Sequence, residues 1–265
     1  MPRYKLTIEY EGTRYHGWQI QKNARTIQGE ITAALQRILN TDQLELYGAG
    51  RTDAGVHALG QVAHLEAPSR LDPAKLQLLL NQELPADIAI IRAERAEARF
   101  HARHHAVSRF YLYQVSRSKS AFAKRFTWWV REPLDLPAMA EAASLFQGTH
   151  DFQSYIDRRA SDVSSLAQID TVAVLEHGDL ILLRFGGAHF LWRMVRRMAG
   201  VIVEAGRGGL STGQVEAFFH QQAEEPGRLT APAAGLFLER VLYPGDPPPD
   251  DPVPALWPGR GQPVS

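Results

Sequence analysis

The stretch LELYGAGRTDAGVHALGQVAHLEA, Leu44 to Ala67, places two strand-like segments on either side of a loop of small residues. Leu44–Gly48 and Gly60–Ala67 are short and largely apolar, and their closeness in the chain predicts an antiparallel pair. The loop between them carries one carboxylate, Asp53, beside alanine and glycine residues that leave it little side-chain cover. The stretch therefore predicts a strand pair whose connecting loop displays a single acid.

Elements on both sides of this pair complete a recognisable order. Alternating side chains predict a strand before this pair and another after it in the chain. Thr26 and Asp72 are suitable N-caps for the two helices. The order strand, helix, strand, strand, helix, strand is that of a ferredoxin-like unit. The added elements are strands at Tyr4–Tyr10 and Asp87–Arg95, and helices from Ile27 to about Asn40 and from Pro73 to about Leu84.

The second half of the chain repeats this order with insertions. Alternating aromatic residues predict its first strand, His177-Gly178-Asp179 predicts a hairpin turn, and Ser211 with Gln214 forms a capping box that opens a helix. The polar stretch Tyr155–Ser165 predicts a mobile loop. The other predicted elements are strands at Ser108–Ser116, Phe126–Glu132, Thr171–Glu176, Leu180–Phe185 and Gly235–Tyr243, and helices at Asp135–Gly148 and Phe190–Ala205.

We therefore expect an α+β fold. It consists of two ferredoxin-like βαββαβ halves whose antiparallel sheets join into one extended mixed sheet flanked by helices, with a central cleft. The halves span residues 1–105, which include the Asp53 loop, and residues 106–245. A Pro-rich acidic tail, 246–265, is expected to be disordered.

The composition excludes several classes of protein. The 265 residues include no cysteine, which excludes disulfides, thiolate metal sites and a cysteine nucleophile, and suits a reducing cytoplasm. The N-terminus has no apolar signal region, and no apolar run is long enough to cross a membrane. We therefore expect a cytoplasmic protein that does not contact a membrane.

The charge is balanced overall but unevenly distributed. A net charge of zero argues weakly against a nucleic-acid binder. However, residues 116–131 contain no acid, and the acidic tail holds Asp246, Asp250 and Asp251. A basic run of this kind usually forms a solvated face, and we favour that interpretation for it alone. Its basic residues are Arg117, Lys119, Lys124, Arg125 and Arg131.

Asp53 has two interpretations that the pattern leaves open. It can be a turn residue whose side chain bonds its own backbone, which is the commoner case. It can also be a carboxylate nucleophile or base, which must stay ionised and so requires a cation within reach. Arg51 is a candidate cation, and His57 lies close behind in the chain.

Three arginines offer a second candidate group. Arg193 precedes Arg196 and Arg197 by three and four residues, so a continuous helix would place all three on one face. A solvated arginine face is the commoner interpretation, although Phe190 and Trp192 surround these cations with aromatic rings.

Aromatic residues elsewhere suit contact with a nucleic-acid base as well as an ordinary core. Tyr111 and Tyr113 lie on the same side of a predicted strand, where a tyrosine could stack on a base or act as an acid or base. The segment YHGWQIQ, with Trp18 and Gln19, suits RNA contact and equally the rim of a hairpin.

The histidines of FHARHH, Phe100 to His105, suggest a metal site only weakly. His101, His104 and His105 lack the further ligands that zinc usually requires, and the chain has no HExxH sequence and no cysteine pair. We therefore expect no metal.

Together these segments resemble a known family. AGRTDAGVHA resembles the aspartate motif of the tRNA pseudouridine synthases of the TruA type. The segments YHGWQIQ, FHARHHAVSRFYLY, HDFQSY, FLWRMVRRMAG and GLFLERVLYP match the same family in the same order, from about Tyr4 to Pro244. Phe110 departs from the pattern, because many members carry a basic residue there. The tail beyond Pro244 has no counterpart in the family.

The resemblance implies a function and a set of roles. The family isomerises uridines 38, 39 and 40 in the anticodon arm of tRNA, as a homodimer without cofactor or metal, and binds tRNA in the central cleft. It implies that Asp53 is the nucleophile, that Arg196 pairs with it, that Tyr111 packs against the target uracil and that Arg51 helps to hold the flipped nucleotide. The remaining candidates for substrate binding are Tyr113, Arg193, Arg197, Trp18, Gln19 and His57.

Three other functions remain open on the residues alone. A non-catalytic RNA-binding protein would use the same basic cleft without converting uridine. A histidine-metal hydrolase would depend on a bound metal, and an α+β domain with a surface turn at Asp53 would do neither.

Overall fold

The computed structural model describes residues 1–156 and 164–256, and these form two compact units. Unit 1 comprises Met1–Arg109 together with Phe237–Pro248, and unit 2 comprises Phe110–Leu236 together with the chain from Pro249 onward. The closing strand of the sequence therefore belongs mainly to the unit that contains the N-terminus. The three-part division into 1–105, 106–245 and 246–265 stays a prediction.

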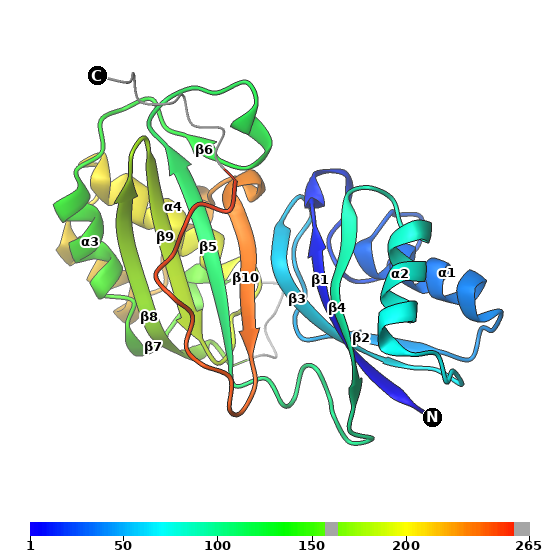
Figure 1. The fold of residues 1–265 in the computed structure, drawn as a ribbon. Coiled ribbons are helices and arrows are strands. Elements are labelled where there is room, and N and C mark those ends of the chain that lie inside the picture. Colours follow the sequence, from blue (N-terminus) through cyan, green and yellow to red (C-terminus); the bar gives the residue numbers. More distant parts are fainter. Residues whose placement is uncertain (157–163, 257–265) are drawn as a thin grey trace. The chain divides into compact units, whose positions relative to one another are not determined.

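Unit 1 contains the elements expected of the first half, and each of them is confirmed. Thr26 caps the first helix through a hydrogen bond from Gly29 N, and Asp72 caps the second through one from Ala74 N. Both helices lie on one side of the unit 1 strands (Figure 1). The elements are β1 Arg3–Tyr10, η1 Gly12–Arg14, α1 Ile27–Leu39, β2 Glu45–Gly48, β3 His57–Glu66, α2 Pro73–Glu83, β4 Ile88–Ala96 and, with its first residue Leu236 in unit 2, β10 Leu236–Leu242.

The sheet of unit 1 has the strand order β4-β1-β3-β10, with β2 also paired to β3. Strands β2 and β3 are antiparallel, as expected, with Leu46 opposite Leu65. Strand β10 runs parallel to β3 instead, with Phe237 opposite His57. The side chains of Tyr4, Leu6 and Ile8 in β1 are fully buried and form part of the core of unit 1.

Unit 2 is also built of strands and helices, with strand order β5-β9-β8-β7 and β6 parallel to β5. Helices α3 and α4 cover one face of these strands (Figure 1). The elements are β5 Ser108–Ser116, η2 Ala123–Arg125, β6 Trp128–Trp129, α3 Leu136–Ser144, β7 Gly148–Asp151, η3 Gln153–Tyr155, β8 Leu166–His177, β9 Leu180–Gly187, α4 Met194–Gly206, α5 Thr212–His220, α6 Glu225–Arg228 and η5 Ala233–Gly235.

The fold class is confirmed as α+β. Ten strands form mixed β-sheet, with parallel as well as antiparallel neighbours, and helices flank it. The central RNA cleft stays a prediction. Most of the predicted Tyr155–Ser165 loop, residues 157–163, lies outside the described residues.

The expected helix at Phe190–Ala205 begins later than the sequence pattern indicates. Arg193 has φ 60° and ψ 2°, a left-handed conformation, and α4 starts only at Met194. The apolar periodicity continues through Phe190 and Leu191, and so it does not reveal the break. The predicted shared helical face of the three arginines is therefore wrong, because Arg193 stands outside the helix and Arg197 is buried.

Part of the tail that was expected to be disordered contacts unit 2. Ala255 N donates a hydrogen bond of 2.7 Å to Oε1 of Gln114, whose side chain is fully buried in β5. The guanidinium of Arg184, also buried, donates to the carbonyl oxygen of Asp250. These two buried polar side chains, rather than the exposed tail side chains, hold the backbone of residues 250–256. The rest of the predicted tail, 257–265, lies outside the described residues.

Removing the tail is expected to destabilise unit 2. A chain ending at Pro248 deprives Gln114 and Arg184 of tail partners, and such losses cost about 1–3 kcal/mol each when the group stays buried. Urea denaturation should show a lower midpoint for this truncation. A chain ending at Leu256 keeps both contacts and is the matched control, and equal midpoints for the two truncations would contradict the expectation.

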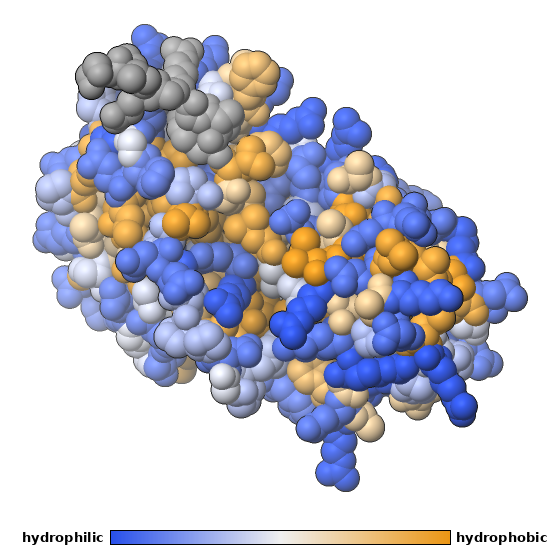
Figure 2. Space-filling model, viewed as in Figure 1, coloured by the Kyte–Doolittle hydropathy of each residue, from blue (hydrophilic) through white to orange (hydrophobic). Residues whose placement is uncertain are grey.

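Hydrophilic side chains cover much of the visible face of each unit, with apolar ones exposed between them (Figure 2). None of the helices in the described ranges, 1–156 and 164–256, is both long and apolar enough to cross a membrane.

Candidate active site

The loop that carries Asp53 is fixed to the strand pair from which it emerges. Ala49 N donates a hydrogen bond of 2.7 Å to Val62 O, which continues the pairing of β2 with β3. One residue further, the buried side chain of Gln61 donates through Nε2 to Gly50 O at 2.9 Å. The strand ladder therefore extends into the start of the loop and limits where the backbone can go.

A segment from the N-terminal part of unit 1 holds the middle of the loop. Trp18 N donates to Thr52 O at 3.1 Å, and the hydroxyl groups of Tyr10 and Thr52 lie 2.8 Å apart in the interior. Gly17 has φ +90°, and a Cβ atom there would lie 2.3 Å from Thr52 O. The close approach of these two backbones therefore requires glycine at position 17.

The turn after Asp53 is made by the backbone. Val56 N donates to Asp53 O at 3.2 Å, and Gly55 adopts φ +79°, a conformation that glycine tolerates. Gly55 N in turn donates to Tyr15 O at 3.2 Å. Because this backbone turn accounts for the bend, the bend itself does not require a carboxylate at position 53.

His57, which follows the loop, is an interior residue. Its side chain is 1% exposed, its Nδ1 accepts a hydrogen bond of 3.1 Å from Gly12 N, and its ring stacks on Phe237 at 4.8 Å. Gly12 is as constrained as Gly17, since a Cβ atom there would lie 1.9 Å from Val56 O. His57 therefore ties the loop to two other segments of unit 1.

Arg109 is a residue of this site that the sequence pattern did not single out. Its guanidinium donates to the carbonyl oxygens of Arg103 at 2.8 Å, Ala49 at 3.2 Å and Ala106 at 3.3 Å. It thereby joins the start of the Asp53 loop to the chain that leads into β5. No local sequence signal could have shown this, because Ala49 lies 60 residues away.

The other predicted residues of unit 1 differ in how far they reach solvent. Asp53 is half-buried and Arg51 is exposed, so both can meet a ligand. Gln19 is half-buried and donates to Gln28 Oε1 at 2.8 Å. Trp18 is only 1% exposed and lies against Gly48, where a Cβ atom would lie 2.6 Å from its ring. Trp18 therefore supports the loop from the interior.

The predicted tyrosines lie in unit 2 and both are buried. Tyr111 is 9% exposed, with its ring edge against Phe190 at 5.1 Å. Tyr113 is fully buried and its hydroxyl donates to Pro232 O at 2.8 Å. Burial raises the pKa of Tyr113 well above its usual range, and the nearby Arg196 cation opposes this in part. Tyr113 is therefore neutral near pH 7.

The three arginines of unit 2 have different surroundings. Arg196 is half-buried, and its Nε donates to Ala231 O at 2.7 Å while Ala231 N donates back to Arg196 O at 3.0 Å. Arg193 is exposed and its guanidinium lies 4.5 Å from the Trp192 ring centre. Arg197 is 7% exposed and lines a hollow with Ser154. Asp53 belongs to unit 1 and Arg196 to unit 2, and their pairing stays a prediction.

Three histidines of unit 1, His64, His101 and His104, form an aromatic cluster. The ring of His101 lies 4.6 Å from that of His64 and 4.2 Å from that of His104. His101 Nδ1 accepts a hydrogen bond from His104 N at 3.3 Å, and His64 Nδ1 accepts one from Ala102 N at 3.1 Å. Within residues 1–156 and 164–256, no group of three or more histidine, aspartate or glutamate side chains is arranged to hold a metal ion.

This cluster predicts a loss of stability in acid. Burial, and to a smaller extent the charges of His101, Arg3 and His104, lower the pKa of His64 to about 4. Because the unfolded chain binds this proton near pH 6.5, the free energy of unfolding should fall as the pH drops from about 6.5 toward 4. The fall should be smaller in His64→Asn, which can keep an acceptor for Ala102 N. Urea titrations at pH 7 and 5 measure the difference, and His189→Asn, at an exposed position, should leave the fall unchanged.

Comparison with known proteins places these features in a family. The model of the family described as tRNA pseudouridine synthase matches residues 6–105 and 142–244. A protein of Moorella thermoacetica named tRNA pseudouridine synthase A is 40% identical over 247 residues, which cover 92% of this chain and 100% of the relative. One of Agrobacterium fabrum with the same name is 37% identical over 254 residues, covering 94% of this chain and 95% of the relative.

The family model covers Asp53 and its loop as well as Arg196, whereas Tyr111 and Tyr113 lie between the two matched ranges. The similarity extends over nearly the full length of the relatives, not over a shared fragment. The chain therefore belongs to the tRNA pseudouridine synthase family of isomerases.

Proposed function

We propose that this chain converts uridine to pseudouridine at positions 38, 39 and 40 of the anticodon stem-loop of tRNA, with Asp53 as nucleophile. The observation that carries the proposal is the Asp53 loop. It holds the backbone of Asp53 between hydrogen bonds at Thr52 and Val56, and the carboxylate that this backbone carries is only half-buried. A fixed nucleophile requires little reorganisation when it attacks.

The reaction needs one such group. The C1′–N1 bond breaks, the uracil turns, and a C1′–C5 bond forms, while the C5 proton leaves and N1 gains a proton. Nothing is oxidised or reduced, and no atom is added to the product. Whether the carboxylate attacks C1′ of the ribose or C6 of the base, the covalent intermediate divides one difficult exchange into two easier steps.

When the uracil leaves the RNA stack, it loses its stacking contacts with neighbouring bases, and protein side chains must replace them. We propose that Arg196 keeps Asp53 ionised, that Tyr111 packs against the flipped uracil, and that Arg51 holds its phosphate. Tyr111 already contacts an aromatic ring, Phe190, and so belongs to an apolar wall that suits a base.

The other candidates divide by exposure into two kinds of role. Exposed or half-buried side chains, Arg193 and Gln19, are proposed to contact the RNA directly. Buried ones are proposed to act through the elements that they support. These are Trp18, His57, Tyr113 and Arg197.

We also propose that the enzyme acts in the cytoplasm as a homodimer and needs neither cofactor nor metal. Two-fold symmetry would let one tRNA contact both protomers. The absence of cysteine is compatible with a reducing compartment.

Tritium release tests the proposal. Unmodified tRNA carrying tritium at uracil C5 is incubated with the protein in the presence of a chelator, and release is compared for tRNAs in which uridines 38, 39 and 40 are each replaced by cytidine. Release that falls with each replacement supports the proposal. If a folded protein binds tRNA but releases no tritium, the chain is a non-catalytic RNA-binding protein. If release is unchanged by all three cytidine replacements, the assigned positions 38, 39 and 40 are wrong.

A further inference from the structure

Residues 117–131 of unit 2 form a fixed extension at the carboxyl end of β5 (Figure 1). The chain passes through η2 and returns as β6, parallel to β5. Val130 N donates to Ser116 O at 2.9 Å, Thr127 Oγ1 donates to Ala123 O at 3.1 Å, and Gln114 Nε2 donates to Phe126 O at 2.8 Å. These bonds hold the extension in one conformation, so its outer side chains stand on a rigid support.

Two aromatic side chains of the extension face solvent. Phe122 is 85% exposed, the highest value for a large apolar side chain among the described residues, and Trp129 is 41% exposed. Exposed single apolar residues are common, but a phenylalanine this open, on the same extension as an exposed tryptophan, is apolar surface that gains by being covered.

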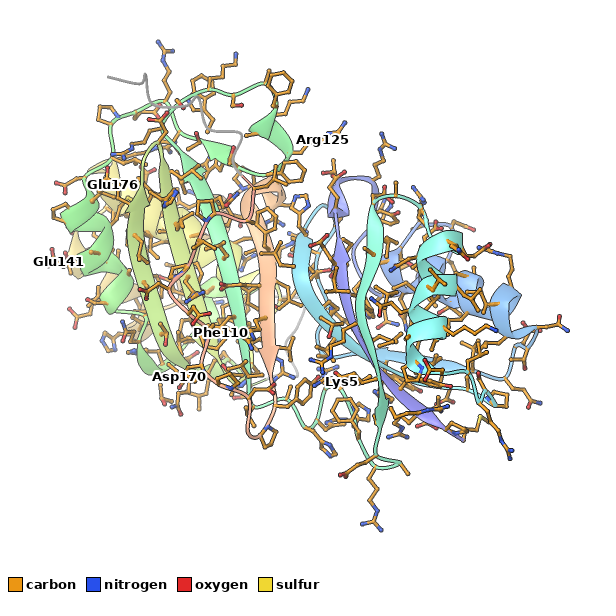
Figure 3. The ribbon with its side chains drawn as sticks, in the orientation of Figure 1. Lys5, Phe110, Arg125, Glu141, Asp170 and Glu176 are labelled. Atoms are coloured by element: carbon orange, nitrogen blue, oxygen red, sulfur yellow. The ribbon has the colours of Figure 1, made fainter. Side chains whose placement is uncertain are left out.

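Cations accompany these rings. Lys119, Lys124 and Arg125 are exposed, and Lys119 Nζ lies 5.3 Å from the ring centre of Trp129. Figure 3 shows Arg125 on η2. Within the ranges that the structure describes, no carboxylate forms an ion pair with Lys119 or Lys124.

Not every basic residue of the run is available in the same way. Arg117 already pairs with Glu176 and also donates to Gly178 O at 2.6 Å, so it supports the hairpin of β8 and β9. We therefore define the basic-aromatic patch by five of the exposed residues on the extension. They are Lys119, Phe122, Lys124, Arg125 and Trp129.

The chemistry of the patch fits one class of partner. Cations that hold phosphates, placed beside exposed aromatic rings that can stack on unpaired bases, are the combination found on single-stranded nucleic-acid surfaces. An acidic protein partner would engage the cations and cover the rings by apolar packing, whereas single-stranded RNA would in addition stack a base on the face of an exposed ring. A plain solvated face, the interpretation favoured by the charges alone, accounts for the lysines and leaves Phe122 unexplained.

We propose that the basic-aromatic patch is a second tRNA-binding surface, which holds backbone phosphates with its cations and stacks an unpaired base on Phe122. It contacts nucleotides other than the uridine that reacts. This inference rests on the proposed function for its choice of tRNA, and it assigns the patch to substrate binding and not to the chemical step.

Paired substitutions separate the two contributions. Phe122→Leu keeps an apolar side chain but removes the ring, and should raise the Kd for tRNA about five- to tenfold or more, as expected for loss of a stacked base. Phe122→Tyr keeps the ring and should restore the wild-type Kd. In both variants kcat at saturating tRNA should be unchanged.

The lysines are tested by salt dependence. Lys119→Gln and Lys124→Gln should each lower the slope of log Kd against log salt by about one, because each loses a phosphate contact. Lys75→Gln, which removes an exposed lysine from α2, is the matched control and should not change the slope. Binding to a short unlabelled single-stranded RNA provides a second measurement that does not depend on catalysis.

The outcomes distinguish this inference from the proposed function. If the wild type releases tritium and the patch variants bind tRNA as tightly as it does, the patch is not an RNA surface and the enzyme assignment is unaffected. If the wild type binds tRNA without releasing tritium, and the patch variants bind more weakly, the proposed function is overturned and the patch is supported. Equal loss of affinity in Phe122→Leu and Phe122→Tyr would overturn the stacking role.

Discussion

Asp53→Asn is expected to abolish pseudouridine formation while the fold and tRNA affinity remain close to those of the wild type. Asparagine has nearly the shape of aspartate, and the backbone turn through Val56 N and Gly55 does not depend on the carboxylate. An amide cannot attack as a nucleophile, and loss of a nucleophile typically reduces kcat by about 10⁴-fold or more. Tritium release measures the loss, and filter binding measures the affinity.

Two further substitutions show what the carboxylate does. Asp53→Glu retains the charge but moves the oxygens by one methylene, so a nucleophile should lose most of its rate while a general electrostatic role should survive. Asp42→Asn changes an exposed acid in the same unit and should have no effect on turnover. If Asp53→Asn kept more than about a tenth of the wild-type kcat, Asp53 would revert to an ordinary turn residue.

The sequence predicts much of the fold because the relevant signals are local. The caps at Thr26 and Asp72 and the capping box at Ser211 all lie where the pattern indicates, since each depends on residues three or fewer positions away. The predictions fail where an element is too short to show a periodic pattern, or where the backbone departs from a pattern that continues. β7 and α6 have four residues each and no period to detect, and the left-handed Arg193 breaks a helix whose apolar pattern continues.

The candidate site also has a part that the sequence predicts and a part that it does not. Asp53 and its small neighbours can be read from the chain, because a lone acid among glycines and alanines is a local pattern. The residues that hold the loop come from elsewhere, since Tyr10 contacts Thr52 across 42 positions and Arg109 contacts Ala49 across 60. No sequence pattern links residues so far apart in the chain. Their contacts with the loop are found only in the folded structure of unit 1.

Gly17→Ala is expected to reduce kcat about 100-fold, because it displaces Thr52, the residue next to the proposed nucleophile Asp53. The new Cβ atom would lie 2.3 Å from Thr52 O, closer than such contacts allow, and 3.1 Å from the carbonyl carbon of Asp53, which is tighter than most such contacts. Alanine at φ +90° adds about 1–2 kcal/mol of backbone strain. The chain must therefore move by a substantial fraction of an ångström, and a misplacement of about 1 Å can cost about 100-fold in rate.

Gly213→Ala is the matched control for this substitution. No heavy atom lies within 4 Å of the position of its added Cβ, and alanine should strengthen helix α5 by about 0.5–1 kcal/mol. Thr52→Val is a milder test of the same contact region, because it removes the hydroxyl that meets Tyr10 OH and keeps the side-chain shape. It should lower kcat by about tenfold and leave the circular dichroism spectrum unchanged.

The pattern of kcat against KM decides between positioning and simple loss of structure. If Gly17 acts by placing Asp53, Gly17→Ala should lower kcat with KM nearly unchanged, because the residues proposed to bind tRNA, apart from Arg51 and Gln19, lie in other segments of the chain. Thr52→Val should show the same pattern at smaller amplitude. A variant that is folded by circular dichroism and retains full kcat would show that the chemistry does not depend on the approach of Gly17 to Thr52, and the Asp53 loop would then have to be regarded as mobile during turnover.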